Sequence, residues 1–306
     1  MSELDLNYHV PVLLAPVLAA ARGARRAVDA TLGDGGHAAA LLDMGAEVLG
    51  IDRDPEAIAV SHRRLGDAGI SYLQAAYASP EALDAVTRFQ PDLILLDLGV
   101  SSRQLDEEGR GFTFRPGAPL DMRMGSEGPN AARLLNEADA GRLEEIFREY
   151  GDERRARRLA AEVIRRRARQ PFRTSDDLVN AIRATLGPRS GPGDFARLFQ
   201  AVRIAVNDEL VGLEHALPVF RDALKPEGRL SIITYHSGED RLVKRMFRSW
   251  SSGCVCPPRL PVCICGVRPF GRVEPRKPIV PEPAELEANP RARSAKLRTF
   301  VVDDTA

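Results

Sequence analysis

Three aspartates, Asp29, Asp52 and Asp97, stand at the ends of apolar stretches that are typical of buried strands. A glycine-rich turn, "TLGDGGH" at residues 31–37, follows the first of them. Glycine lets a backbone turn tightly and lets a ligand approach its N–H groups. Carboxylates beside such a turn accept hydrogen bonds and attract positive charge. These residues predict a ligand site where the strand ends meet.

The glycine turn admits two ligand chemistries. Gly33-x-Gly35-x-x-Ala38 matches the dinucleotide fingerprint, and Asp52 follows Gly33 by nineteen residues. No Gly-Lys-Ser/Thr follows the turn, which excludes a P-loop. Asp34 places negative charge where a pyrophosphate must bind, whereas the sulfonium and ammonium groups of S-adenosylmethionine are attracted by acids. We expect S-adenosylmethionine, with an NAD-dependent dehydrogenase as the enzymatic alternative and a ligand-free turn as the structural one.

Asp97 ends the apolar run "LILLD" at residues 93–97. Ligands of open α/β sheets bind at the carboxyl edge of the strands, and an aspartate that ends an apolar strand is seldom there for stability. The structural alternative is that Asp97 caps the next loop through the amides of Ser101 or Ser102. The pattern favours a functional carboxylate.

The elements that must position these residues alternate between strand and helix patterns, which predicts an α/β fold with a parallel sheet. Pro55, early in one helical pattern, suits a helix start. The predicted strands are 25–32, 46–54, 70–77, 92–100, 229–236 and 294–302, and the first predicted helices are 37–44, 55–65 and 80–89.

The alternation stops after residue 100. Residues 101–130 read as a loop, and helical patterns follow without strands, for example the apolar stripe of Leu159, Ala160, Val163 and Ile164. A further pattern predicts one long helix from Phe195 to Leu210. We therefore predict a helical insertion over residues 111–205 in a discontinuous α/β domain of residues 1–110 and 206–306. The Pro-rich stretch 272–285 is expected to be an extended connection.

The bulk composition is that of a globular protein with a substantial core, because 44% of its 306 residues are hydrophobic. The sequence has no apolar run of membrane-spanning length and no secretory signal, so we expect a cytoplasmic protein. The net charge is zero, but nine arginines and four acidic residues lie between Arg148 and Arg169. Arginine suits RNA phosphates and bases, although such runs are often solvated helix faces. The candidate RNA contacts are Arg154, Arg155, Arg157, Arg158, Arg165, Arg166 and Arg167, with Arg291, Arg293, Lys296 and Arg298 as the alternative group.

Eight long motifs follow one another along nearly the whole chain, namely "HVPVLL" at 9–14, "DATLGDGGH" at 29–37, "GIDRDPEAI" at 50–58, "LLDLGVSSRQLD" at 95–106, "RGFTFRPGAPLDMRM" at 110–124, "FQAVRIAVNDEL" at 199–210, "ITYHSGEDRLVKR" at 233–245 and "NPRARSAKLR" at 289–298. In these motifs and in their order the chain resembles the bacterial ribosomal RNA small subunit methyltransferase H family. The resemblance implies a Rossmann-like class I S-adenosylmethionine-dependent methyltransferase sheet with an inserted all-helical domain that recognises RNA. It implies methylation of the exocyclic amino nitrogen of one cytidine in the decoding centre of 16S ribosomal RNA, with the small ribosomal subunit as partner and neither membrane nor DNA.

The resemblance also assigns a donor site, residue by residue. Tyr77 stands where the family often has phenylalanine, and either ring can cover an adenine face. Asp34 departs from the family pattern and is left out, while His37 is expected to act through its backbone N–H at a helix start. The donor-binding residues are expected to be Gly35, Gly36, His37, Asp52, Tyr77, Asp97 and Gln104.

A cytosine amino group is a poor nucleophile, so the site must orient it and accept its proton. Asp97 is the expected acceptor, although the stretch Asp97-Leu98-Gly99-Val100 lacks the prolines and aromatic ring of many amino-methyltransferases. No cysteine lies near the first four strand ends, which disfavours methylation of a cytosine carbon. Phe112, Phe114 and Tyr235 are the candidates for the ring that stacks on the target base, and the sequence does not choose among them.

Three further residues are candidates for the chemistry. His236 and Asp240 follow the fifth strand in "HSGED", where the alternative is a helix start capped by Ser237 and completed by Asp240. Asn207 is a helical asparagine among apolar residues and needs a partner.

The four cysteines, Cys254, Cys256, Cys263 and Cys265, form two Cys-x-Cys pairs. Their number suits a tetrahedral zinc site, but their spacing is tighter than usual. A non-catalytic RNA-binding protein that kept the fold is the alternative to an enzyme, and the intact glycine turn, Asp52 and Asp97 argue against it.

Overall fold

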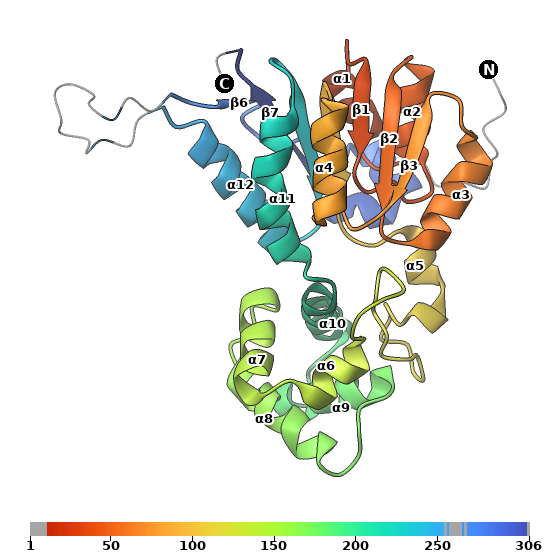
Figure 1. Cartoon of the computed structure of the whole chain (residues 1–306). Coiled ribbons are helices and arrows are strands. Elements are labelled where there is room, and N and C mark those ends of the chain that lie inside the picture. Colours follow the sequence, from red (N-terminus) through yellow and green to blue (C-terminus); the bar gives the residue numbers. More distant parts are fainter. Residues whose placement is uncertain (1–10, 254–255, 257–264, 266–267, 305–306) are drawn as a thin grey trace. The chain divides into compact units, whose positions relative to one another are not determined.

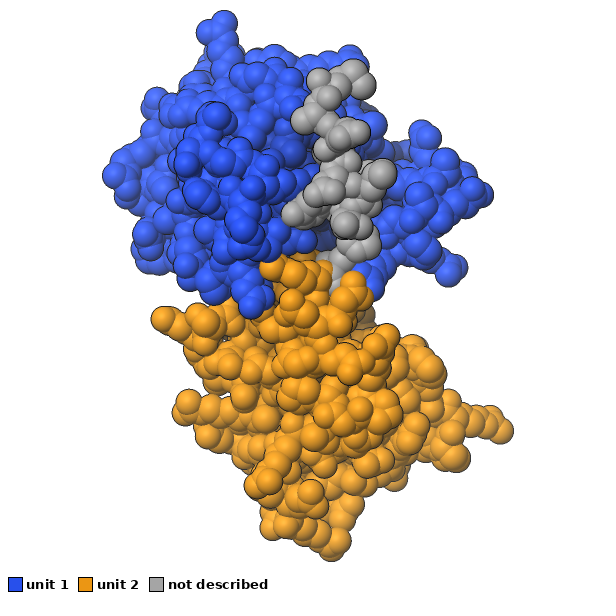
Figure 2. Space-filling model, turned by 90° about the vertical axis from the view of Figure 1, so that its right-hand side faces the viewer, with its two compact units in different colours: residues 1–99, 212–306 blue, residues 100–211 orange. Residues whose placement is uncertain are grey.

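The computed structural model describes residues 11–253, 256, 265 and 268–304. The chain forms two compact units, residues 1–99 with 212–306 and residues 100–211, coloured blue and orange in Figure 2. The second unit begins before and ends after the predicted insertion of 111–205. It begins earlier because the stretch expected to be a loop after residue 100 contains a capped helix, α5 (Ser102–Asp106), and the turn η1 (Glu108–Arg110).

The first unit is built on one seven-stranded sheet (Figure 1). Its order is β3-β2-β1-β4-β5-β7-β6; the first five strands are parallel, and β7 is antiparallel to both β5 and β6. This confirms the predicted α/β class. The strands are β1 (Arg26–Asp29), β2 (Glu47–Asp52), β3 (Ile70–Gln74), β4 (Leu93–Asp97), β5 (Arg229–Thr234), β6 (Gly271–Val273) and β7 (Lys296–Val302).

Two helices of the first unit, α3 and α4, begin at residues whose side chains cap them. Asp54 accepts the N–H of Glu56 at the start of α3, Ser79 accepts that of Ala82 at the start of α4, and a proline follows each cap. Leu93 to Leu96 of β4 are all fully buried, as expected for a central strand covered on both faces. The helices are α1 (Leu14–Ala20), α2 (Gly36–Asp43), α3 (Pro55–Leu65), α4 (Pro80–Phe89), α11 (Glu209–Ala223), α12 (Ser237–Trp250) and α13 (Pro283–Ala288), with the short turn η3 (Pro290–Ser294).

The second unit is helical and has its own core. Leu159, Ala160 and Val163 are buried in it and Ile164 packs against it, as the apolar stripe predicts. Thr174 and Asp177 form a capping box at the start of α9. After α5 and η1, its elements are α6 (Ala131–Glu137), α7 (Ala140–Glu145), the π-helical turn η2 (Ile146–Tyr150), α8 (Ala156–Arg167), α9 (Ser175–Leu186) and α10 (Pro192–Asn207).

Two predicted elements are wrong. The helix expected from Phe195 to Leu210 is broken at Asp208, whose φ of 51° is left-handed, so that α10 ends at Asn207 and α11 begins at Glu209. Aspartate tolerates this conformation, and the apolar spacing continues across the break without revealing it. The stretch 272–285, expected to be extended throughout, contains most of β6 and the start of α13. No helix of the described residues is both long and apolar enough to cross a membrane.

Candidate functional site

The strand-ending aspartates Asp29, Asp52 and Asp97 lie on neighbouring strands. β1 pairs with β2 on one side and with β4 on the other, and Asp29 is in register with Gly50 and Leu95. Asp52 and Asp97 end β2 and β4 two residues beyond these partners. Because the strands are parallel, all three carboxylates lie at one edge of the sheet.

Asp52 supports the glycine turn. Its Oδ2 accepts the N–H of Gly33 at 2.8 Å, and its Oδ1 accepts the N–H of Asp54 at 2.8 Å. Burial raises the pKa of this carboxyl, while both backbone hydrogen bonds lower it. Each carboxylate oxygen keeps a further lone pair, so Asp52 retains the capacity to accept hydrogen bonds from ribose hydroxyls.

The glycines of the turn are required by close packing. Gly35 has a φ of 76°, and a Cβ there would lie 2.9 Å from Ser61 Oγ on α3. A Cβ on Gly36 would lie 2.6 Å from the Pro11 ring. The pattern that suggested a ligand cradle therefore also serves to pack the start of α2.

The His37 ring is buried beside Asp97, and donor contact through the His37 backbone N–H stays a prediction. The side chain is buried, and Nε2 lies 3.0 Å from the Val12 carbonyl oxygen. A carbonyl only accepts, so Nε2 carries the hydrogen and Nδ1 of the neutral ring is bare. Burial lowers the pKa of His37, which keeps it neutral. Its Nδ1 lies 3.8 Å from Asp97 Oδ2.

Asp97 is held by contacts from two other strand ends. Its backbone N–H donates to Thr31 Oγ1 at 2.6 Å, and Tyr235, directly after β5, donates its hydroxyl to Asp97 Oδ1 at 2.8 Å. Burial raises the pKa of Asp97 to about 7, although the Tyr235 hydrogen bond lowers it. Burial and the neighbouring Asp97 raise the pKa of the Tyr235 hydroxyl, so it remains a donor. Of the two amides in the capping alternative, the Ser101 N–H donates to Gln104 Oε1 at 3.1 Å and not to Asp97.

Asp29 belongs to the ligand site that the strand ends predict, although it is not among the donor-binding residues that the family resemblance assigns. Its side chain is 1% exposed, and Oδ1 accepts the Thr31 N–H at 3.3 Å. Oδ2 has no hydrogen-bond partner among the described residues. Burial raises the pKa of Asp29 to about 6. Burying a carboxylate oxygen without a hydrogen-bond partner costs free energy. The sequence indicated Asp29 only as an acid that ends a strand shortly before the glycine turn.

Tyr77 and Gln104, two expected donor contacts, are placed in different units. Tyr77 follows β3 in the first unit, half-buried, with its ring centroid 6.4 Å from that of Phe220. Gln104 belongs to the second unit, where its Oε1 accepts the Ser101 N–H at 3.1 Å in a capping box. Donor contact stays a prediction for both.

The helix start after β5 is correctly predicted, but its cap is not. His236 is the N-cap residue, and its Nδ1 accepts the N–H groups of Gly238 and Glu239 at 3.2 and 3.4 Å. Glu239, 2% exposed, accepts the backbone N–H groups of Tyr235 and His236. The predicted pair of Ser237 and Asp240 is therefore replaced by His236 and Glu239, because an imidazole nitrogen accepts as a serine hydroxyl does.

Asp240 and Asn207, two candidates for the chemistry, hold structure together. Asp240 forms ion pairs with Lys296 at 3.2 Å and Arg298 at 2.8 Å on β7, which lower its pKa against the effect of burial. Asn207, in the second unit, accepts the Met124 N–H at 2.8 Å and donates to the Met122 carbonyl at 2.7 Å.

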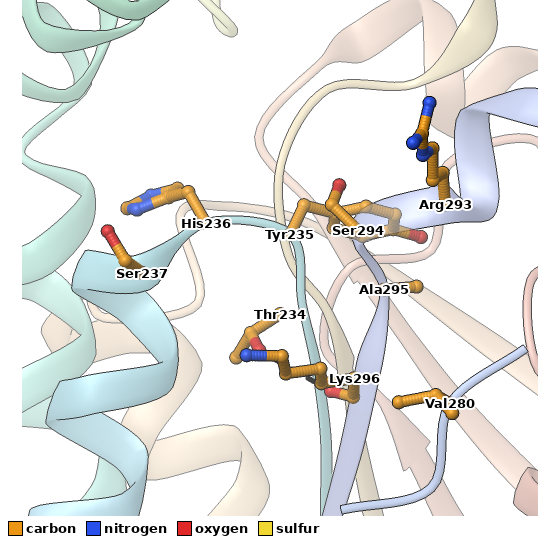
Figure 3. Close-up of a pocket in the computed structure, with 9 residues that line it drawn as sticks. All are labelled: Thr234, Tyr235, His236, Ser237, Val280, Arg293, Ser294, Ala295 and Lys296. Carbon is orange, nitrogen blue, oxygen red and sulfur yellow. Dashed lines mark hydrogen bonds between the residues drawn. The ribbon is translucent and has the colours of Figure 1, made fainter.

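A cleft of about 250 Å³ opens beside Tyr235 in the first unit (Figure 3). In this view Ser294 of η3 overlaps the Tyr235 ring, Arg293 stands above and to the right of it, and Thr234 and Lys296 lie below it. Phe112 and Phe114, the other ring candidates, pack against the core of the second unit, where Phe114 makes edge contacts to Phe195 and Phe199. Tyr235 is therefore the ring candidate that contacts the Asp97 carboxylate. The lining residues are Thr234, Tyr235, His236, Ser237, Val280, Arg293, Ser294, Ala295 and Lys296.

The predicted zinc ligands fall largely outside the part of the chain that the structure describes. Cys254 and Cys263 are not among the described residues, and the described part contains no group of three or more potential metal ligands. The zinc site stays a prediction.

Taken together, the sheet order, the antiparallel β7 and the acids that end β2 and β4 define a Rossmann-like, S-adenosylmethionine-dependent methyltransferase. The model of the MraW methylase family matches residues 7–302, and the chain belongs to this family. It is 56% identical over 299 residues to the Ribosomal RNA small subunit methyltransferase H of Gemmatimonas aurantiaca, covering 96% of this chain and 95% of that protein. The proteins of the same name from Heliobacterium modesticaldum and Rubrobacter xylanophilus are each 46% identical, with 95% of this chain and 97% and 94% of those proteins covered.

Proposed function

We propose that this enzyme methylates the exocyclic amino nitrogen of a cytidine in the decoding centre of 16S ribosomal RNA, within the small ribosomal subunit. The names of its relatives support a small-subunit ribosomal RNA substrate. The residues at the sheet edge support transfer to an amino nitrogen, because they provide a carboxylate acceptor and no thiol nucleophile from the described strand ends.

The charge of the sheet edge matches the methyl donor. Asp29, Asp52 and Asp97 gather there beside a His37 ring that burial keeps neutral, and Asp29 Oδ2 lacks a partner within the described part of the chain. Burial raises the pKa of all three carboxyls, as expected for acids removed from water. S-adenosylmethionine supplies an electrophilic methyl group and carries positive charge on sulfur and on its ammonium. The pyrophosphate of NAD would add negative charge, which disfavours the dehydrogenase alternative.

The contact that carries the proposal is the hydrogen bond from Tyr235 to Asp97. The amino lone pair of cytosine is delocalised into the ring, so methyl transfer requires an acceptor for the departing proton. The ionised Asp97 carboxylate accepts the amino N–H and then its proton. Tyr235 occupies Oδ1 and so fixes the direction in which Oδ2 points.

The direct test is methyl transfer to purified small subunits and to transcribed 16S RNA, read by mass spectrometry of the digested nucleosides. We expect N4-methylcytidine with the wild-type protein and almost none with Asp97→Asn. Methylation at a ring carbon, or on another base, would contradict the proposal.

Calorimetric titration with S-adenosylhomocysteine and with NAD separates the alternatives. We expect binding of S-adenosylhomocysteine alone. NAD binding would favour the NAD-dependent dehydrogenase. Tight RNA binding with neither ligand bound would indicate a non-catalytic RNA-binding protein.

A further inference from the structure

The arginines of α8 and its flanks divide into two groups that the sequence does not distinguish. Arg165 and Arg166 share one carboxylate, Glu162, each at 2.6 Å. Arg167 donates to the carbonyls of Leu135 and Ala138. Arg165 and Arg166 are thus paired within α8, and Arg167 joins α8 to the end of α6, so three of the seven candidate arginines already have partners within the helical unit.

The arginines of the second group do not form contacts of this kind. Arg154, Arg157 and Arg158 are exposed, and none has a hydrogen-bond or ion-pair partner among the residues that the structure describes. Arg157 and Arg158 lie in the first turn of α8, and Arg154 directly precedes its N-cap residue, Arg155. The side that packs in the core is formed by other residues, namely Ala156, Leu159, Ala160 and Val163.

Arg189 extends this surface from the turn that follows α9. The Arg155 guanidinium donates to the carbonyls of Thr185 and Leu186, which joins the start of α8 to the end of α9. Arg189, three residues beyond Leu186, is exposed and likewise has no partner within the described ranges. We call Arg154, Arg157, Arg158 and Arg189 the α8 arginine face.

Helix stability does not explain the α8 arginine face. The N-terminus of a helix carries the positive end of its dipole, where cations are unfavourable, and the first turn of α8 contains no acidic residue. Of the two acids just before the helix, Glu153 is buried and paired with Arg197 at 2.6 Å, while Asp152 is exposed. Of the acids that directly precede α8 only Asp152 is exposed, so the arginines leave a surplus of positive charge that attracts a polyanion.

We propose that the α8 arginine face binds the phosphodiester backbone of the RNA substrate. This rests on the proposed function, because that function makes RNA the polyanion that the enzyme must hold. A guanidinium pairs with phosphate oxygens through two parallel hydrogen bonds, and an arginine without a carboxylate partner forms them without breaking an ion pair. Such contacts position a nucleic acid without reading its sequence.

The helix offers a matched pair of variants. Arg157→Gln/Arg158→Gln and Arg165→Gln/Arg166→Gln each remove two adjacent positive charges from α8, but only the first removes unpaired ones. The probe is transcribed 16S RNA, with its affinity measured by filter binding across a potassium chloride series. We expect the first variant to bind about tenfold more weakly and to lose about one unit of salt slope per removed contact, also on an unrelated RNA. The second variant should bind nearly as the wild type does.

Further measurements separate the loss of charge from damage to the fold or to the donor site. Equal melting temperatures show that the fold is kept, and equal affinities for S-adenosylhomocysteine show that the donor site is intact. Arg157→Lys/Arg158→Lys should recover most of the affinity, because it restores the charge. In methylation assays the first variant should raise KM for RNA and leave kcat unchanged.

The inference is overturned if the two Gln variants bind alike, or if the Lys variant binds as weakly as its Gln counterpart. It is also overturned if the first variant loses affinity for assembled subunits but not for naked RNA, since the partner is then a ribosomal protein. Absence of methylcytidine with the wild-type enzyme is a different result, because it contradicts the proposed function. The RNA affinities of the two Gln variants still decide whether the α8 arginine face binds RNA.

Discussion

The two units of this protein treat charged groups in opposite ways. At the sheet edge, the buried Asp29 and the partly exposed Asp97 have no lysine or arginine partner among the described residues, and burial raises their pKa to about 6 and about 7. On α8, the carboxylate of Glu162 is paired with two guanidinium groups, which lower its pKa to about 2. The ionised form of a carboxyl group is thus destabilised in the first unit and stabilised in the second. Charge left uncompensated in a folded protein indicates where a ligand of opposite charge belongs.

The largest effect that tests this comparison is expected at Asp97. Asp97→Asn keeps the shape of the side chain but removes the proton acceptor, so kcat should fall by about 10²- to 10⁴-fold. Donor affinity should change much less. With a pKa of about 7, the wild-type carboxyl gains its acceptor form as pH rises, so kcat/KM for RNA should increase up to about pH 7 and then level off. Equal losses in donor affinity and in rate would place Asp97 among donor-holding residues instead.

Asp29→Asn separates charge from hydrogen bonding in the donor site. We expect about tenfold weaker S-adenosylhomocysteine binding, read by calorimetry, because a carboxylate that attracts the ligand ammonium is lost. The ligand-free variant should be more stable than the wild type by at most about 3 kcal/mol above pH 6, because the buried charge is gone.

The raised pKa of Asp29 also determines whether the free energy of unfolding rises or falls with pH. Between about pH 4 and about pH 6 the folded protein holds a proton that the unfolded chain has lost, so the wild type loses stability as pH rises through this range. The stability difference between Asp29→Asn and the wild type should therefore vanish near pH 4. Urea unfolding at pH 4, 6 and 8 measures it, and a difference independent of pH would exclude Asp29 as its source.

Asn207 provides the contrast of a buried polar group whose hydrogen bonds are satisfied within the protein. Asn207→Ala leaves the Met124 N–H and the Met122 carbonyl without their partner, so the free energy of unfolding should fall by about 1–3 kcal/mol. The folded variant should keep the wild-type kcat. A fall in kcat at full stability would return Asn207 to the candidates for the chemistry.

The smallest effect is expected at Tyr235, which acts through Asp97. Its hydrogen bond lowers the pKa of Asp97, so Tyr235→Phe should shift the rising limb of the rate profile to higher pH and reduce kcat a few-fold at neutral pH. The other titratable groups that face the Asp97 site, Asp29, His37 and Glu239, remain in place. Tyr72→Phe is the matched control, because Tyr72 donates to the Gly66 carbonyl, outside this cluster. A profile that does not move would show that Tyr235 is structural.

Much of the fold was readable from the sequence, because the strands that form its centre are continuous apolar runs. The run at Leu93 to Leu96 predicted a strand buried on both faces, and β4 is that strand. The break at Asp208 was not readable, because a single left-handed residue leaves the apolar spacing on both sides unchanged.

The acids of the site could be predicted from the sequence, but their hydrogen-bond partners could not. Asp52 and Asp97 stood out as strand-ending carboxylates, and Asp29 preceded the glycines. The Tyr235–Asp97 hydrogen bond joins residues 138 positions apart, and its geometry depends on β5 lying beside β4. Likewise, the sequence presents Arg158 and Arg165 as equals, and only the position of Glu162 separates the paired arginines from the unpaired ones.

The position of the helical unit within the chain affects how the protein is made. β4 is complete at Asp97, but its outer edge pairs with β5, which begins at Arg229. During translation at typical bacterial rates, the intervening residues take on the order of ten seconds to synthesise. Throughout that interval the most apolar strand of the sheet has an unpaired edge, the feature that promotes pairing between nascent chains. Slowing synthesis of the insertion by synonymous codons would prolong this exposure without changing a residue of the protein.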